Sequence, residues 1–133
     1  NIFKEKKPEI VFHAAALKHV PIVEKNPIEG ILTNVFGTIN IAESCKKHSA
    51  LEMVLISTDK AVNPFSVMGV TKRISEKYCQ GITNKSKTNF KIVRFGNVIE
   101  DSATSVATYT FLSYPSSIYL LLNFSLLILY IPF

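Results

Sequence analysis

A group of polar side chains follows a short apolar run near the middle of the chain. Residues 53–56 (MVLI) have the length and composition of a fully buried strand. The next residues are Ser57, Thr58, Asp59 and Lys60. Met68 and Lys72 lie four positions apart, on one face of a predicted helix. Open parallel sheets bind ligands at the carboxyl ends of their strands, so this group indicates proton transfer beside a bound anion or cofactor.

Strand and helix patterns alternate on both sides of this group. Asn26-Pro27-Ile28-Glu29 is typical of a helix start, and apolar residues recur at helical spacing after it. We expect Val70, Ile74, Tyr78 and Ile82 to share the apolar face of the second helix. The predicted elements are strands at 9–13, 53–56 and 90–95, and helices at 26–48 and 66–82. This order predicts an α/β fold, the central βαβαβ portion of a doubly wound parallel sheet.

Composition limits the classes of partner and site. Fifteen Lys and Arg face ten Asp and Glu, for a net charge of +5, and all of them lie before residue 102. Basic residues do not alternate with aromatic ones as in a nucleic-acid groove, so we expect no nucleic acid partner. Cys45 and Cys79 lack CxxC spacing and are typical of a reducing, cytoplasmic setting. His13 and His19 have no evident third ligand, so we predict no metal site.

Five motifs occur together and in a familiar order. They are HAAALKHVP at 13–21, TN at 33–34, STDKA at 57–61, MGVTK at 68–72 and RFGNV at 94–98. Together they resemble the extended short-chain dehydrogenase/reductase family. Within it, the similarity is to the CapD-like nucleotide-sugar 4,6-dehydratases, lyases that act on UDP-N-acetylglucosamine in polysaccharide biosynthesis. The resemblance implies a partial NAD(P)-binding Rossmann domain over residues 1–99. It also implies a UDP-sugar substrate and a parent protein that is a homo-oligomer. The choice between NAD and NADP as the cofactor stays open.

The resemblance also implies roles for individual residues. The catalytic residues would be Thr58, Asp59, Lys60, Met68 and Lys72. The cofactor would contact Ala14, Ala15, Ala16, Asn34, Ser57 and Lys72. The substrate would contact Lys18, His19 and Asn97, and Arg94 would take part in a structural ion pair. Many relatives have Tyr where this chain has Met68, and a thioether cannot exchange protons, so the hydroxyl role would pass to Thr58. The residues alone also allow another interpretation, in which Met68 fills a gap in the core and Lys72 is a surface lysine.

The implied reaction has three stages. Hydride leaves sugar C4 for bound NAD(P), Lys60 removes the C5 proton while Asp59 protonates the departing C6 hydroxyl, and the hydride returns to C6. Lys60 would need a lowered pKa and Asp59 a raised one, whereas an ion pair between them would shift both pKa values in the wrong direction.

The sequence departs from the resembled family at both ends. It contains no G-x-G-x-x-G turn for the cofactor pyrophosphate, and after Val98 it follows the family no further. Residues 100–133 form a divergent apolar tail without an assigned domain. Residues 118–133 are short for a membrane span, so we favour an out-of-frame tail over a membrane anchor. We therefore interpret the chain as a fragment that is inactive alone, with weak or no NAD(P) binding.

Two alternatives of function stay open at this stage. In one, the chain is a non-catalytic, membrane-associated protein that acts through its apolar tail. In the other, it belongs to an epimerase or a reductase of the same family, which would share the fold and most of the motifs.

Overall fold

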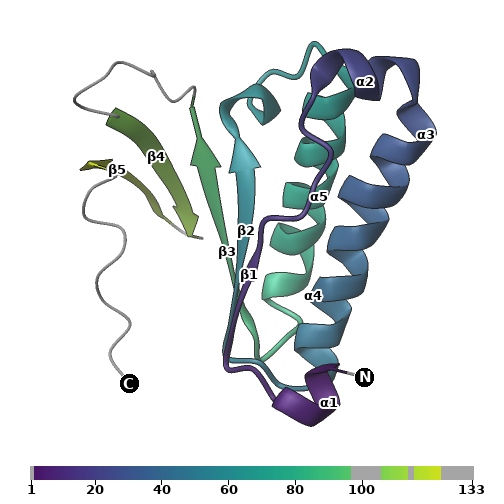
Figure 1. Cartoon of the computed structure of the whole chain (residues 1–133). Coiled ribbons are helices and arrows are strands. Elements are labelled where there is room, and N and C mark those ends of the chain that lie inside the picture. Colours follow the sequence, from purple (N-terminus) through teal and green to yellow (C-terminus); the bar gives the residue numbers. More distant parts are fainter. Residues whose placement is uncertain (1, 97–105, 114–115, 124–133) are drawn as a thin grey trace.

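A five-stranded sheet organises the protein. The computed structural model describes residues 2–96, 106–113 and 116–123. In sheet order the strands are β1 (Ile10–His13), β2 (Glu52–Thr58), β3 (Asn89–Phe95), β4 (Val106–Ser113) and β5 (Ser116–Asn123). β1, β2 and β3 are parallel, whereas β4 pairs antiparallel with β3 and β5 with β4 (Figure 1). The three predicted parallel strands are confirmed.

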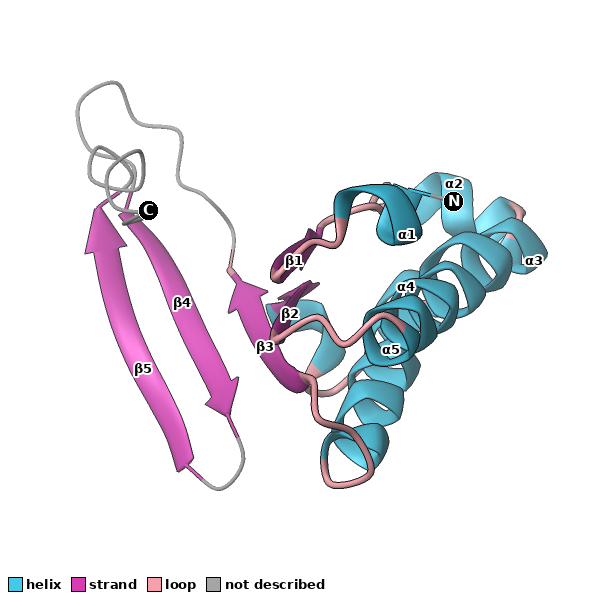
Figure 2. Cartoon of the chain, turned by 90° about the horizontal axis from the view of Figure 1, so that it is seen from below, coloured by secondary structure: helices cyan, strands magenta, loops and turns pink. Residues whose placement is uncertain are grey.

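Helices lie on one face of the sheet, and those that follow β1 and β2 connect the parallel strands (Figure 2). They are α1 (Ile2–Lys6), α2 (Val20–Lys25), α3 (Pro27–Gly30), the π-helical η1 (Ile31–Phe36), α4 (Gly37–Lys47), the 3₁₀ turn η2 (Asp59–Ala61) and α5 (Val67–Thr83). α5 begins where the sequence predicts it, because the Ser66 side chain caps the helix by accepting from the Gly69 N–H. The two long crossovers are the helical connections that a parallel sheet requires.

The predicted single helix after Asn26 contains a π-helical segment. Within η1, the Asn34 carbonyl accepts hydrogen bonds from Thr38 Oγ1 at 2.6 Å and from Ser75 Oγ at 2.7 Å. Hydroxyl donors of this kind compete with the backbone N–H groups of the helix. The widened turn follows from these side-chain contacts, which a 3.6-residue pattern does not encode.

The predicted apolar face of α5 is wrong at two of its four positions. Val70 is 41% exposed and Ile74 is 46% exposed, whereas Tyr78 and Ile82 pack against the core. The buried residues of α5 are Met68, Gly69, Thr71, Lys72, Ser75, Glu76 and Cys79. Hydrogen bonds and ion pairs satisfy most of these polar groups, so the face that looks polar in the sequence lies inside.

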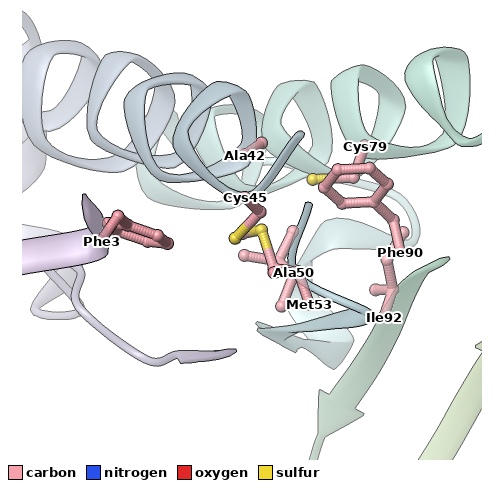
Figure 3. Packing of buried hydrophobic residues seen from close by; sticks show 9 residues of the cluster. Phe3, Ala42, Cys45, Ala50, Met53, Cys79, Phe90 and Ile92 are labelled. Atoms are coloured by element: carbon pink, nitrogen blue, oxygen red, sulfur yellow. The ribbon is translucent and has the colours of Figure 1, made fainter. Parts of the chain in front are cut away.

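The main core lies between the helices and the sheet (Figure 3). It comprises Phe3, Ala42, Cys45, Ala50, Met53, Leu55, Cys79, Phe90 and Ile92. Both cysteines are free thiols, and both are buried in the way that small hydrophobic residues are. Burial raises the pKa of Cys45 to about 11 and that of Cys79 to about 12, so both stay neutral near pH 7.

The other face of the sheet carries a second, smaller apolar cluster. Val54 and Val93 form it with Ile56 and Phe95, while Phe12 of β1 is 66% exposed. In the described residues the helices cover only the opposite face (Figure 2). The described part is thus one side of the doubly wound arrangement.

The apolar tail contributes two strands where no domain was assigned. Residues 106–113 and 116–123 are rich in Leu, Thr and Tyr, and they form β4 and β5. The segment 118–133, for which a membrane anchor was the less favoured interpretation, falls partly in β5, and its remainder lies outside the described residues. In the part of the chain that the structure describes, no helix is long and apolar enough to span a membrane.

Candidate active site

A pocket of about 480 Å³ opens at the carboxyl ends of the parallel strands. We call it the strand-end pocket. Its lining residues are Ala14, Ala16, Lys18, Ile56, Ser57, Thr58, Lys60, Met68, Lys72, Phe95 and Gly96. Eight of the predicted site residues thus meet in one cavity. Ala15, His19, Asn34 and Asp59 are not among the lining residues, and Asn97 lies outside the described residues.

Lys72 is the buried cation of the pocket. Its side chain comes from the first turns of α5, and Nζ donates to the Ile56 carbonyl of β2 at 2.9 Å. The residue is only 7% exposed. Burial lowers the pKa of Lys72, and the negative charge of Glu76 partly opposes that effect. Lys72 is therefore not the surface lysine that its residue type alone would allow.

Met68 lies beside Lys72 in the same pocket and is 4% exposed. The two residues are one helical turn apart, as the spacing predicts. A thioether offers no proton to exchange. Any acid or base at this end of the pocket must come from another residue.

Thr58, Asp59 and Lys60 form a hydrogen-bonded group at the end of β2. Asp59 Oδ1 accepts from Thr58 Oγ1 at 2.8 Å, from the Lys60 N–H at 2.8 Å and from Lys60 Nζ at 3.3 Å. Partial burial favours the neutral acid, but these hydrogen bonds and the Lys60 charge outweigh it, and the pKa of Asp59 falls below its ordinary value. In this arrangement Asp59 is an anion near pH 7.

Replacing Thr58 with valine should raise the pKa of Asp59, because one hydrogen bond to the carboxylate is lost. A lowered pKa in the folded state stabilises the fold above the unfolded-state pKa, and that contribution disappears as the pH falls through the folded-state value. The Thr58→Val stability loss should therefore shrink on acidification. NMR titration of the carboxyl carbon measures the Asp59 pKa, and urea unfolding at several pH values measures the loss of stability. An unchanged Asp59 titration in the variant would contradict the hydrogen bond from Thr58.

Asn34 connects the backbone next to the pocket with α5. Its side chain accepts from the Leu17 N–H at 2.7 Å, donates to the Leu17 carbonyl at 3.1 Å and donates to Thr71 Oγ1 at 2.9 Å. It is 1% exposed, so it does not face solvent. The amide holds the loop of Ala14–Ala16 against α5, which shapes the site; a direct cofactor contact stays a prediction.

His13 belongs to the same buried network rather than to a metal site. Its Nε2 lies 3.0 Å from Thr38 Oγ1, whose only proton is donated to the Asn34 carbonyl. His13 Nε2 is then the donor of this hydrogen bond. Burial and the nearby Lys72 charge lower the pKa of His13. In the described residues, no group of three or more His, Cys, Asp or Glu could hold a metal ion.

Ser57 carries a polar atom inside the pocket that has no partner among the described residues. The residue is 4% exposed, and its Oγ makes no hydrogen bond within that part of the chain. A buried hydroxyl of this kind is costly unless a partner binds it. This orphaned oxygen, beside the small side chains of Ala14 and Ala16, fits a bound polar ligand.

Gly69 allows α5 to approach the loop that carries the acid–base group. A Cβ atom at this position would lie 2.6 Å from the Lys60 carbonyl oxygen and 3.2 Å from Pro64 Cβ. Gly69 belongs to the motif at 68–72, but the motif does not reveal this role. The signal for that role is a long-range contact, which no local pattern contains.

Replacing Gly69 with alanine should destabilise the fold by about 1–3 kcal/mol, because backbone atoms must move to relieve the contact. Gly81 of the same helix is the matched control, since a Cβ there meets nothing within 4 Å. Gly81→Ala should stabilise the helix by up to about 1 kcal/mol. Thermal unfolding of both variants measures the difference; equal changes of the same sign would rule out the close contact.

A buried ion pair lies one helical turn after Lys72, between α5 and β3. Arg94 of β3 donates to Glu76 of α5, which confirms the predicted structural role of Arg94. Sequence reasoning did not single out Glu76. Its position one turn after Lys72 was the available signal.

Comparison with known proteins agrees with this geometry. The family model described as "Polysaccharide biosynthesis protein" matches residues 1–111. The chain belongs to this family. Capsular polysaccharide biosynthesis protein CapD of Staphylococcus aureus is 54% identical over 100 residues, covering 74% of this chain and 17% of CapD. A UDP-N-acetylglucosamine 4,6-dehydratase (inverting) of Campylobacter jejuni is 42% identical over 94 residues, covering 68% of this chain and 28% of that enzyme.

Solved structures place this member of the polysaccharide biosynthesis family among Rossmann-type folds. UDP-glucose 4-epimerase of Thermotoga maritima, solved with UDP-glucose, has a TM-score of 0.67 at 25% identity. The match covers 70% of this chain and 35% of the epimerase chain. The Thermus thermophilus UDP-glucose 4-epimerase, solved with NAD, has a TM-score of 0.63 at 22% identity. The match covers 66% of this chain and 33% of the epimerase. The chain thus spans about a third or less of the proteins it matches.

Proposed function

We propose that this chain carries the acid–base part of an NAD(P)-dependent nucleotide-sugar 4,6-dehydratase of the UDP-N-acetylglucosamine type. The observation that carries the proposal is the meeting of Lys72, Lys60 and Thr58 in one strand-end pocket, with Asp59 hydrogen-bonded to Thr58 and Lys60. The CapD and dehydratase relatives support the reaction type.

The pocket offers suitable partners for a dinucleotide. The orphaned Ser57 hydroxyl and the Lys72 ammonium are polar contacts for a ribose, and Ala14 and Ala16 leave room for a flat ring. When bound, the cofactor would take up a hydride from the sugar and return it. Lys72 would hold the cofactor through its remaining N–H donors, since one is bound to the Ile56 carbonyl.

The sugar would be handled by the group at the end of β2. We assign the base that removes the C5 proton to Lys60 and the acid that protonates the departing C6 hydroxyl to Asp59. In the described arrangement the two residues form an ion pair with 3.3 Å between Lys60 Nζ and Asp59 Oδ1. The step needs Lys60 as a neutral amine and Asp59 as a protonated acid, so substrate binding would have to transfer the Lys60 proton to Asp59. Elimination then leaves Lys60 as an ammonium and Asp59 as a carboxylate again. A substrate can reach the pair, because both side chains are more than 40% exposed. Lys18 at the rim is a candidate for a substrate phosphate.

A chimaera tests the proposal. Residues 8–96 would replace the matching segment of the Campylobacter jejuni dehydratase, and the product from UDP-N-acetylglucosamine would be identified by NMR. We expect a 4-keto-6-deoxy sugar nucleotide. A folded chimaera that yields only a 4-epimer or a reduced sugar would support the epimerase or reductase alternative instead. The unmodified host enzyme is the positive control.

NAD(P) binding by residues 1–133 provides a second test. We expect no binding at micromolar affinity, about −8 kcal/mol, because these residues contain no glycine-rich turn for the pyrophosphate. The chimaera should bind the cofactor, and Lys72→Ala in the chimaera should weaken that binding. Micromolar affinity of residues 1–133 in calorimetry would mean that the strand-end pocket suffices alone.

We also propose that a second copy of the chain covers an apolar groove on the outer side of η1 and α5. Ile31, Val70 and Ile74 line this groove of about 300 Å³, and the fully exposed Phe65 stands on its rim. A two-fold contact over this groove would bury its apolar side chains in both copies, together with the exposed Phe65. Ile74→Glu should then shift the oligomer to monomer in sedimentation velocity, whereas Asn40→Glu on α4 should not. A monomeric unmodified protein would exclude this contact.

A further inference from the structure

Glu76 lies at the centre of a buried charge network behind the strand-end pocket. It is 0% exposed. Arg94 binds both carboxylate oxygens, with Nε 2.8 Å from Oε1 and Nη2 2.5 Å from Oε2, and Arg73 Nη1 lies 3.2 Å from Oε2. Two-point binding of this kind fixes the orientation of both groups.

The network joins the three elements that build the inner wall of the pocket. Arg94 on β3 is paired in register with Ser57 on β2, and the next two residues of the chain, Phe95 and Gly96, line the pocket. Glu76 and Lys72 are one turn apart on α5. The carboxylate therefore ties the helix that carries Lys72 to the strand that ends at the pocket.

We propose that Glu76, held by Arg94, is a positioning residue that keeps the Lys72 ammonium charged and directed into the strand-end pocket. The role in catalysis rests on the proposed dehydratase function. The effect on Lys72 itself does not depend on that function.

The charges around Lys72 explain why a carboxylate is needed there. His13 faces it from β1, Lys18 and Lys60 share the pocket, and Arg94 approaches from β3 behind Glu76. These groups are cationic or, for His13, neutral near pH 7. The half-exposed Asp59 is already engaged by Thr58 and Lys60. Burial lowers the pKa of Lys72, and Glu76 is the group that opposes this.

A double variant separates this role from a purely structural one. In Glu76→Met/Arg94→Met the buried pair is replaced by apolar side chains of similar length, an exchange that folded proteins often tolerate. The pKa of Lys72 would be followed in the whole chain by NMR of ¹³C-labelled lysine, with the signal assigned through Lys72→Arg. We expect a retained fold and a smaller change of the Lys72 pKa than removal of the Glu76 charge alone would cause, because the Arg94 cation is removed together with the carboxylate.

Two further variants make the result decisive. Glu76→Gln keeps the shape of the side chain, removes only its negative charge and should lower the Lys72 pKa. Arg73→Gln removes the more exposed cation and should not lower it. An unchanged or raised Lys72 pKa in folded Glu76→Gln would overturn the proposal, and so would an equally large downward shift in the double variant. No cofactor or substrate is present, so an inactive chimaera would count against the proposed function alone.

Discussion

Replacing Glu76 alone with alanine is expected to destabilise the chain by about 3–5 kcal/mol. The substitution leaves Arg94, whose side chain is 11% exposed, as a buried cation without its carboxylate partner. It also removes the tie between α5 and β3. Domains of this size are stable by only about 5–15 kcal/mol, so the variant should unfold at markedly lower urea concentration.

Arg73→Gln is the matched control for this prediction. Arg73 contacts the same carboxylate, but its side chain is 34% exposed and water can replace the contact. We expect a loss of about 1 kcal/mol or less. Equal losses for Glu76→Ala and Arg73→Gln would show that the two-point contact with Arg94 does not hold the helix to the sheet.

Replacing Lys60 with methionine in the chimaera is expected to reduce dehydration by about 10²–10⁴-fold, the usual contribution of a general base. The substitution keeps the length of the side chain and removes the amine that is assigned to the C5 proton. Cofactor binding should stay close to that of the unsubstituted chimaera, because Lys72 and Ser57 are untouched. Product formation under saturating substrate, with calorimetry of NAD(P) binding, measures the two effects separately.

Lys46 offers a closely matched control for Lys60. Its side chain is 40% exposed and paired with Glu43, against 42% for Lys60 paired with Asp59, but it lies on α4 and does not line the pocket. Lys46→Met should leave product formation unchanged. If Lys60→Met lowered the rate no more than Lys46→Met does, the base would have to be another residue of the pocket.

The sequence alone determined the three parallel strands, the two crossover helices and the end of the sheet where the site lies. Each of these rests on a local signal: the apolar run before Ser57, the start of a helix near Ser66 and the Asn26-Pro27 start of a helix. The structural ion pair of Arg94 was predicted as well, although its partner Glu76 was not. Local patterns suffice here because strand, cap and turn preferences act between near neighbours.

Only the tertiary structure decided which polar residues lie inside. Thr71, Ser75 and Glu76 look like the solvent face of α5, yet partners on η1 and β3 satisfy them after burial. The π-helical turn at Asn34 and the need for glycine at position 69 likewise depend on contacts with distant segments. Burying a polar group is costly or harmless according to the partner it meets, and that partner is brought near only when the chain folds.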